Sequence, residues 1–192
     1  MTLDRVALGR GEPHAVDAFY RAHARTVLRW VIRLGGPRLD PEDTAHDVFL
    51  AALGAIGRYR TDAPLEPWLF GVTRRVVANA RRRAWFRRIV GWDDELVVVD
   101  RSPGADARLD QLRRRRLVQE VLEQLTDSQR EVLVLSDLEG RSAPEVAALL
   151  GIPVGTVYSR VHGARKQFAA VLGSGPFSLS HDALRDALRE EP

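Results

Sequence analysis

The stretch from Ser142 to Lys166 constrains the fold of this chain more than any other. It predicts a helix that Gly151 ends, then a tight turn, then a second helix. Ser142 and Glu145 have the spacing of a capping box, in which the hydroxyl accepts a backbone N–H and the carboxylate reaches back. The apolar positions fall where two crossing helices face each other, and Ala147 allows a close approach; they are Val146, Leu150, Ile152, Val157 and Val161. This pattern predicts a DNA-binding helix-turn-helix.

The composition bounds the rest of the chain. Its 192 residues, 45% hydrophobic and 29% charged, are typical of a globular protein with one or two domains. Cysteine is absent from the sequence, which excludes disulfides and cysteine metal sites and fits a reducing compartment. The N-terminus does not resemble a signal peptide, and no run approaches the ~20 apolar residues of a membrane span. We therefore expect a cytoplasmic protein that does not insert into membranes.

Charge is distributed in blocks. The net charge is only +3, and Lys166 is the sole lysine among 29 basic residues. Residues 58–90 carry nine arginines and two acids, whereas residues 91–110 carry six acids and two arginines. The alternation predicts a basic surface followed by an acidic linker.

Two amphipathic helices are expected near the N-terminus, over residues 15–34 and from Asp40 onward, with Asp40 as N-cap. His23 lies on the apolar stripe of the first helix and is interpreted as a packed histidine, not a ligand or base. One face of the second helix places Asp43, Asp47 and Leu50 together. An exposed leucine between two aspartates favours a surface that binds a partner. The alternative, a solvated face with one stray leucine, is not excluded. A metal site at the two aspartates would need further ligands.

A loop over residues 57–67 and a long helix from Trp68 follow. In the loop, Tyr59 and Arg60 can stack on or clamp an unpaired base. The helix, expected to run to Arg83 or Arg88, has an apolar stripe of Trp68, Leu69, Val72, Val76 and Ala80. Its opposite face gathers Gly71, Arg74, Arg75, Ala78, Arg81 and Arg82. Arginines separated by small residues favour contact with nucleic acid over a merely solvated face.

The fold expected is all-α, with two small helical domains joined by a flexible acidic linker. Residues 15–90 form the first domain, 91–110 the linker and 111–172 the second domain with the helix-turn-helix. Helices are expected from Gln111 to Leu125 and from Thr126 onward. The tail 173–192 could form one short helix and has no assigned role.

The second helix of the helix-turn-helix is expected to enter a major groove. Thr156, Ser159 and Arg160 are the expected base readers, and Tyr158 is expected to contact the backbone or a thymine methyl. Cations later in the helix are expected to neutralise phosphates. The candidate contacts of this domain are Ser142, Thr156, Tyr158, Ser159, Arg160, Arg165 and Lys166.

The combined motifs resemble the extracytoplasmic-function sigma factors of bacterial RNA polymerase over about residues 15–170. The resemblance is carried by the Asp43–Leu50 segment, Tyr59-Arg60, Trp68-Leu-Phe with its basic helix, and the Gln124–Leu135 segment. Gly151-Ile-Pro-Val-Gly-Thr-Val-Tyr-Ser-Arg160 is its most specific part.

The resemblance implies a non-enzymatic protein without cofactor or metal, whose partners are core RNA polymerase, promoter DNA and an anti-sigma factor. Residues 15–90 would be region two, which binds the polymerase clamp through Asp43, Asp47 and Leu50 and opens the −10 element. The −10 contacts implied are Tyr59, Arg60, Trp68, Arg74, Arg75 and Arg81. Residues 111–172 would be region four, which reads the −35 element.

The linker length is compatible with this arrangement. Two elements about 25 base pairs apart lie about 85 Å apart at ~3.4 Å per step. A linker of about 20 residues spans up to ~66–72 Å, and the widths of the domains supply the rest. Two alternatives stay open: a helix-turn-helix regulator that never joins polymerase, and an enzyme acting on nucleic acid. The sequence shows no catalytic triad, phosphate loop or carboxylate cluster for the second.

Overall fold

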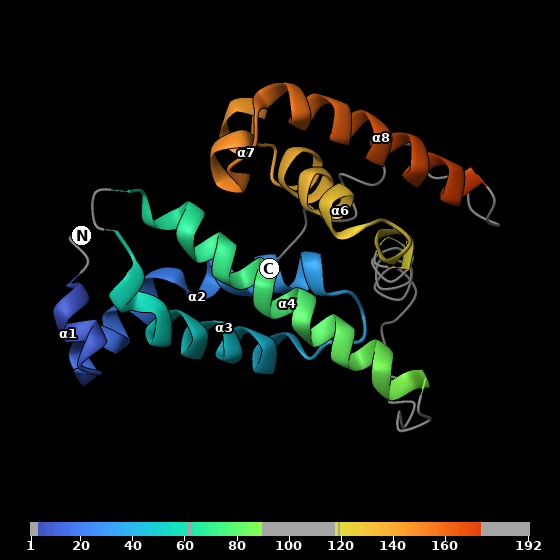
Figure 1. The fold of residues 1–192 in the computed structure, drawn as a ribbon. Coiled ribbons are helices and arrows are strands. Elements are labelled where there is room, and N and C mark those ends of the chain that lie inside the picture. Colours follow the sequence, from blue (N-terminus) through green and yellow to red (C-terminus); the bar gives the residue numbers. More distant parts are fainter. Residues whose placement is uncertain (1–3, 61–62, 90–117, 119, 174–192) are drawn as a thin grey trace, which may run out of the picture. The chain divides into compact units, whose positions relative to one another are not determined.

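The structure is a computed structural model of the chain, and it describes residues 4–60, 63–89, 118 and 120–173 (Figure 1). These residues are helical apart from caps, turns and loops, so the all-α prediction is confirmed. They are described as an N-terminal unit, residues 4–89, and a C-terminal unit, residues 118–173, each by itself. The predicted linker 91–110, most of the helix expected from Gln111 and the tail beyond Gly173 lie outside the described residues.

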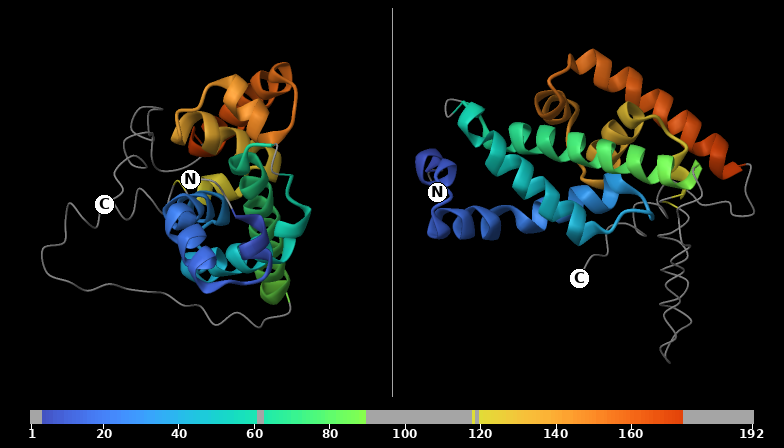
Figure 2. Two further views of the ribbon diagram at one scale, coloured as in Figure 1. Left: turned by 90° about the vertical axis from the view of Figure 1, so that its left-hand side faces the viewer. Right: turned by 60° about the horizontal axis from the view of Figure 1, so that its bottom comes forward.

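The N-terminal unit contains four α-helices and one short 3₁₀ turn. They are α1 (Arg5–Gly9), α2 (Pro13–Gly35), α3 (Pro41–Ala55), η1 (Ile56–Arg58) and α4 (Leu65–Ile89). Figures 1 and 2 show α2, α3 and α4 side by side. Trp30 of α2 is fully buried, and its ring meets Phe70 of α4 edge-on, with centroids 5.0 Å apart. Such an edge-to-face pair adds about 0.5–1.5 kcal/mol to the burial of the two rings.

The ends of α2 and α3 confirm the sequence prediction. Gly36 caps α2 with a φ of 80°, a conformation that favours glycine. Asp40 caps α3, and its carboxylate accepts the Asp43 N–H at 2.8 Å. Pro41 occupies the first turn, where a missing N–H has no cost.

Helix α1 was not expected from the sequence, because five residues are too few for a periodic pattern. Asp4 caps it by accepting the N–H groups of Val6 and Ala7 at 3.1 and 3.0 Å. Ala7 and Leu8 are buried, and α1 packs against η1 at the end of α3. A short helix is therefore stabilised by its cap and by tertiary packing rather than by its own propensity.

Helix α4 begins earlier than predicted and is rotated relative to the predicted stripe. It starts at Leu65, because Pro67 then lies in the first turn, where proline is tolerated. The buried positions are Leu69, Phe70, Thr73, Val77, Ala80 and Ala84. Val72 and Val76, expected on the apolar stripe, are only half-buried. Thr73 was not predicted in the core, because its side chain is polar. It can be buried because its hydroxyl donates locally, to the Leu69 carbonyl at 2.9 Å.

The C-terminal unit contains the helix-turn-helix. Its elements are α6 (Asp127–Leu133), a π-helical turn η2 (Val134–Leu138), α7 (Ala143–Leu150) and α8 (Val154–Gly173). Its core includes Val118, Val121, Leu122, Leu125, Val132, Leu133, Val134, Leu135, Val146, Ala147, Leu149, Val157, Val161, Ala164 and Phe168. Leu149 replaces the expected Leu150 as the buried leucine of α7, and Leu150 is half-buried.

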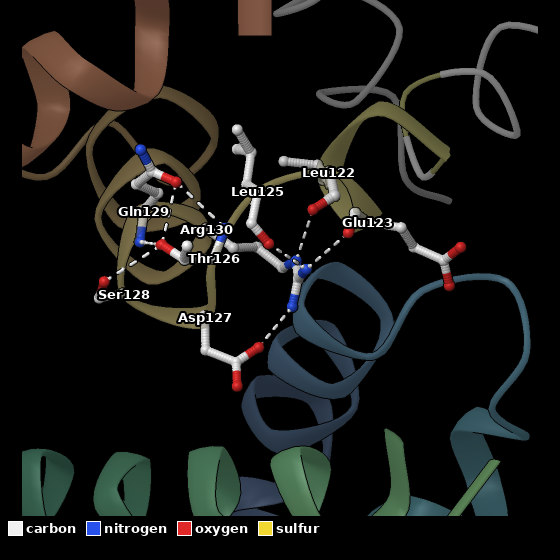
Figure 3. A network of polar contacts seen from close by, with 8 residues as sticks. All are labelled: Leu122, Glu123, Leu125, Thr126, Asp127, Ser128, Gln129 and Arg130. Atoms are coloured by element: carbon white, nitrogen blue, oxygen red, sulfur yellow. Dashed lines mark hydrogen bonds and ion pairs between the residues drawn. The ribbon is translucent and has the colours of Figure 1, made fainter. Parts of the chain in front are cut away.

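A buried arginine joins α6 to the segment before it (Figure 3). Arg130 is 3% exposed, and its guanidinium donates to the carbonyls of Leu122 and Leu125 at 2.8 and 2.9 Å. A third N–H meets the Asp127 carboxylate at 2.9 Å. Thr126 and Gln129 form a capping box at the start of α6. Arg130 therefore supplies a donor to the Leu125 carbonyl and a second donor to the Leu122 carbonyl, which also accepts the Leu125 N–H at 3.2 Å.

Candidate nucleic-acid and partner surfaces

The turn between α7 and α8 sets the geometry of the helix-turn-helix. Gly151 has a φ of 66°, and the N–H of Ile152 donates to the Ala147 carbonyl at 3.2 Å. A hydrogen bond from the N–H of residue i to the carbonyl of residue i−5 is typical of a Schellman motif. The motif needs a positive φ, which explains why a glycine ends α7. Pro153 then accepts the N–H of Thr156 at 2.9 Å and opens α8. The predicted break between the two helices is confirmed.

The first two turns of α8 carry polar side chains toward solvent. Tyr158 is 65% exposed, Ser159 is exposed, and Thr156 and Arg160 are half-buried; Lys166, farther along α8, is also exposed. The Ser159 hydroxyl donates to the Thr156 carbonyl at 3.1 Å. The face opposite the core stripe of Val157 and Val161 thus presents hydroxyls, an aromatic ring and cations, the groups that contact base edges and phosphates.

Ser142 and Glu145 interact, but the Ser142 hydroxyl donates a hydrogen bond where the sequence predicted that it accepts one. The Ser142 N–H donates to Glu145 Oε2 at 2.8 Å, as a capping box requires. The Ser142 hydroxyl donates to the same oxygen at 2.6 Å. These bonds lower the pKa of the Glu145 carboxyl. The expectation that the hydroxyl accepts a backbone N–H was wrong, because the carboxylate is the stronger acceptor within reach.

Arg165 does not present its whole guanidinium to solvent. Its Nε donates to Asp137 Oδ2 at 3.0 Å, and its Nη2 donates to Oδ1 at 2.6 Å. The hydrogen bonds to Asp137 raise the pKa of Arg165. Sequence reasoning missed Asp137, since 28 positions separate the partners and no local pattern joins them.

The three residues predicted to form a partner surface on α3 are all exposed. Leu50 is 55% exposed, and Asp43 and Asp47 are exposed on the same helix. Asp47 also lies beside α4, with its Oδ2 3.9 Å from an Arg83 nitrogen, and both side chains are more than half exposed. At that distance and exposure the pair is weak, below about 1 kcal/mol, and can open to a partner.

The loop after η1 is organised around Tyr59. Its ring is 5% exposed and lies 5.1 Å from the half-buried Trp68 ring, and its hydroxyl donates to the Ala63 carbonyl at 2.6 Å. The Tyr59 ring is covered in this conformation, so a base could stack on it only once the loop had opened, and the predicted stacking role stays a prediction. Tyr59 here shapes the loop, whereas the neighbouring Arg60 is exposed.

The predicted arginine face of α4 lies away from the core. Arg75 and Arg82 are exposed, and Arg74 and Arg81 are half-buried, while Thr73 and Val77 point into the core. Arg82 donates to Asn79 one turn earlier. Arginines therefore lie along the side of the helix that its packing leaves open.

His23 packs against the core of the N-terminal unit, as predicted. His23 packs against Phe19 with ring centroids 5.0 Å apart, and burial lowers its pKa. Within the described ranges, no three histidine, aspartate or glutamate side chains converge to hold an ion.

Comparisons with known proteins give the family. Residues 19–87 match Sigma-70 region 2, and residues 115–168 match Sigma-70 region 4. The ECF RNA polymerase sigma factor SigL of Mycobacterium tuberculosis is 36% identical over 158 residues, covering 80% of this chain and 86% of SigL. The probable RNA polymerase sigma-C factor of Mycobacterium bovis is 33% identical over 168 residues, covering 86% and 87% of the two chains.

Solved structures agree with these matches. CnrH, solved in complex with the cytosolic domain of CnrY, superposes with a TM-score of 0.58 at 29% identity, covering 88% of this chain and 95% of CnrH. RpoE of Bartonella quintana, solved with the anti-sigma factor NepR, shares the fold with a TM-score of 0.56 at 24% identity, covering 81% and 97%. The predicted resemblance is confirmed, and the chain belongs to the extracytoplasmic-function sigma factors.

Proposed function

We propose that this protein directs core RNA polymerase to specific promoters and initiates transcription there. The observation that carries the proposal is the pairing of a region-2 match over 19–87 with a region-4 match over 115–168 in one chain. A regulator that acts alone at an operator has no use for a region-2 unit. Sigma factors are non-enzymatic, and we propose that this chain likewise acts by binding alone. None of the helices described here is long and apolar enough to cross a membrane.

The surface proposed to bind polymerase consists of Asp43, Asp47 and Leu50. Its support is the exposure of a large apolar side chain beside two carboxylates on a well-capped helix. Exposed apolar groups rimmed by charge suit a protein partner.

The surface proposed to engage the −10 element lies on α4 and the preceding loop. Arg74, Arg75 and Arg81 would contact the DNA backbone and bases, and Arg60 would contact an unpaired base. Tyr59 and Trp68 would support the loop, since their rings pack on each other.

Reversing the charge of Arg74 and Arg75 to Glu should abolish strand opening while polymerase binding is retained. The loss would be seen as missing permanganate reactivity at promoter thymines. A matched Arg38→Glu variant, changed in an exposed loop between α2 and α3, should open promoters normally.

The surface proposed to read the −35 element is the exposed start of α8. Thr156, Ser159 and Arg160 would contact base edges in the major groove, and Tyr158 a methyl group or the backbone. Lys166 would neutralise a phosphate. Ser142 lies at the start of α7 and would approach the DNA backbone from there.

A protein partner that regulates this chain is also proposed. CnrH was solved with the cytosolic domain of CnrY, and RpoE with an anti-sigma factor. Because the present chain shares the family with the first and the fold with the second, an anti-sigma factor would cover part of the surfaces described above.

Transcription in vitro tests the proposed function. Core RNA polymerase is incubated with genomic DNA of the source bacterium, with and without the purified chain, and transcript starts are sequenced. We expect a set of new starts that share two upstream elements. If no new start arises while the chain still binds duplex DNA, the protein is a helix-turn-helix regulator instead. Chemical change of DNA by the chain alone would favour an enzyme.

A further inference from the structure

The ion pair between Asp137 and Arg165 connects two parts of the helix-turn-helix unit. Asp137 lies in the π-helical turn η2, and Arg165 lies on α8, 28 residues later. Both carboxylate oxygens are engaged by two different nitrogens of one guanidinium, at 3.0 and 2.6 Å. This two-point geometry fixes orientation as well as distance. The π-helical turn is a rare conformation that is frequent at functional sites.

The two partners differ in exposure. The Asp137 side chain is 6% exposed, whereas the Arg165 side chain is 52% exposed. A carboxylate that is almost fully buried is rare unless it is paired, and Arg165 supplies Asp137 with a charged partner. Its Oδ1 also accepts the Ser136 hydroxyl at 3.1 Å. Asp137 therefore forms the buried half of the contact, and Arg165 of α8 forms the exposed half.

The packing beside this pair explains why its loss would move α8. Ala164, the residue before Arg165, is fully buried, and it continues the core stripe of Val157, Val161 and Phe168. Apolar packing holds α8 against α6 but is not directional. The bidentate contact between Arg165 and Asp137 is directional, because its two hydrogen bonds form only at one rotation of α8.

A phosphate would have to compete with this arrangement. The Nε–Nη2 edge that holds Asp137 is one of the two guanidinium edges that can bind phosphate in a bidentate fashion, so the contact with Asp137 occupies one of them. The paired charges also cancel, so Arg165 releases few counterions when DNA binds. Lys166 is the next residue and is exposed, so it provides an internal comparison.

We propose that Asp137 is a positioning residue for promoter recognition: through Arg165 it holds the recognition helix α8 at the rotation that presents Thr156, Ser159 and Arg160 to bases. Arg165 acts within the protein and does not bind a phosphate. This inference rests on the proposed function, and it replaces the expected phosphate role of Arg165.

The test compares four variants of the full chain bound to core polymerase. They are Arg165→Gln, Lys166→Gln, Asp137→Asn, and the double variant Asp137→Asn with Arg165→Gln. The probe is a duplex enriched from a random pool by the wild-type holoenzyme, with a scrambled duplex for comparison. Affinities are measured over a series of KCl concentrations, at a temperature where circular dichroism shows each variant folded.

The salt dependence separates the roles of the two cations. We expect Lys166→Gln to reduce the slope of log Kobs against log salt by roughly 0.9, the value for one lost phosphate contact. Arg165→Gln should leave the slope within about 0.3 of wild type, because its charge is already neutralised. A reduction of roughly 0.9 in Arg165→Gln would overturn the proposal.

The preference for the selected over the scrambled duplex tests positioning. It should fall at least about tenfold in Asp137→Asn and in Arg165→Gln, and the double variant should lose no more than either single one. A purely stabilising pair would lower the melting temperature but leave the preference of folded molecules unchanged, and that result would also overturn the proposal. If the wild-type holoenzyme enriches no duplex, the proposed function itself fails, and this inference fails with it.

Discussion

Replacing Arg130 with Met should destabilise the C-terminal unit strongly, because the arginine donates to two buried backbone carbonyls at the end of the preceding helical segment. Methionine is similar in length and apolar, so it fills the space while removing all donors. The change removes the short bonds to the carbonyls of Leu122 and Leu125 and the contact with Asp127. The two carbonyls remain in an interior that is nearly inaccessible to water, since Leu122 and Leu125 are 2% and 4% exposed.

The magnitude follows from the two short hydrogen bonds. Each bond from a charged donor contributes about 1.5–3 kcal/mol, so their loss costs about 3–6 kcal/mol. Part of this is offset, because the Leu122 carbonyl keeps its bond from the Leu125 N–H and because methionine removes the cost of burying a guanidinium. We expect a net loss of about 2–4 kcal/mol, equivalent to roughly 10–30 °C in melting temperature for a unit of this size. Asp127 is 63% exposed, so Asp127→Asn should cost less than about 1 kcal/mol.

Thermal unfolding by circular dichroism, with hydrogen exchange to locate the change, measures this effect. Amides in α6 and α8 should lose protection in Arg130→Met, and those of α2 and α3 should keep it. The reasoning would be refuted if Arg130→Met cost under about 1 kcal/mol or no more than Asp127→Asn, because the carbonyls would then be satisfied without the arginine.

Further predictions concern the turn, the capping pair and the polymerase surface. Gly151→Ala should cost about 1 kcal/mol in urea unfolding, because φ is 66° there, whereas Gly155→Ala in α8 should not destabilise. Bonds from Ser142 lower the pKa of Glu145, so they stabilise the fold above the ordinary carboxyl pKa, and this contribution is lost as pH falls through the lowered value. The stability difference between wild type and Ser142→Ala should therefore be present at neutral pH and vanish in acid. Leu50→Asp should prevent co-purification with polymerase without lowering the melting temperature, since Leu50 is 55% exposed.

Much of the fold could be predicted because it rests on local signals. The cap at Asp40, the stop at Gly36 and the turn at Gly151 each depend on a residue type whose backbone preference or side-chain acceptor acts within a few positions. The rotation of α4 was predicted less well. Thr73 is buried and Val76 only half-buried, and a pattern based on hydrophobicity alone assigns these two residues the wrong way round.

The exposed surfaces were partly predictable for the same reason. A periodic pattern shows which side of a helix a residue occupies, and it correctly placed Asp43, Asp47 and Leu50 in solvent. The burial of Tyr59 was not predicted, because a loop has no period and a tyrosine ring beside Trp68 packs readily once its hydroxyl has an acceptor.

The sequence indicates the role of an arginine less clearly than that of other residues. This matters here because lysine occurs once in the chain and the other basic residues counted with it are arginines. Arg130 and Arg165 belong to the same unit as Lys166, yet one is buried on carbonyls and the other is engaged by a buried aspartate. Neither can contribute to a DNA-binding field as a free cation would, because that field depends on charge that is not neutralised within the protein. The number of arginines therefore overstates the electrostatic attraction of the C-terminal unit for DNA. Its promoter preference must depend more on the orientation of α8, which is the property that the Asp137–Arg165 pair is built to control.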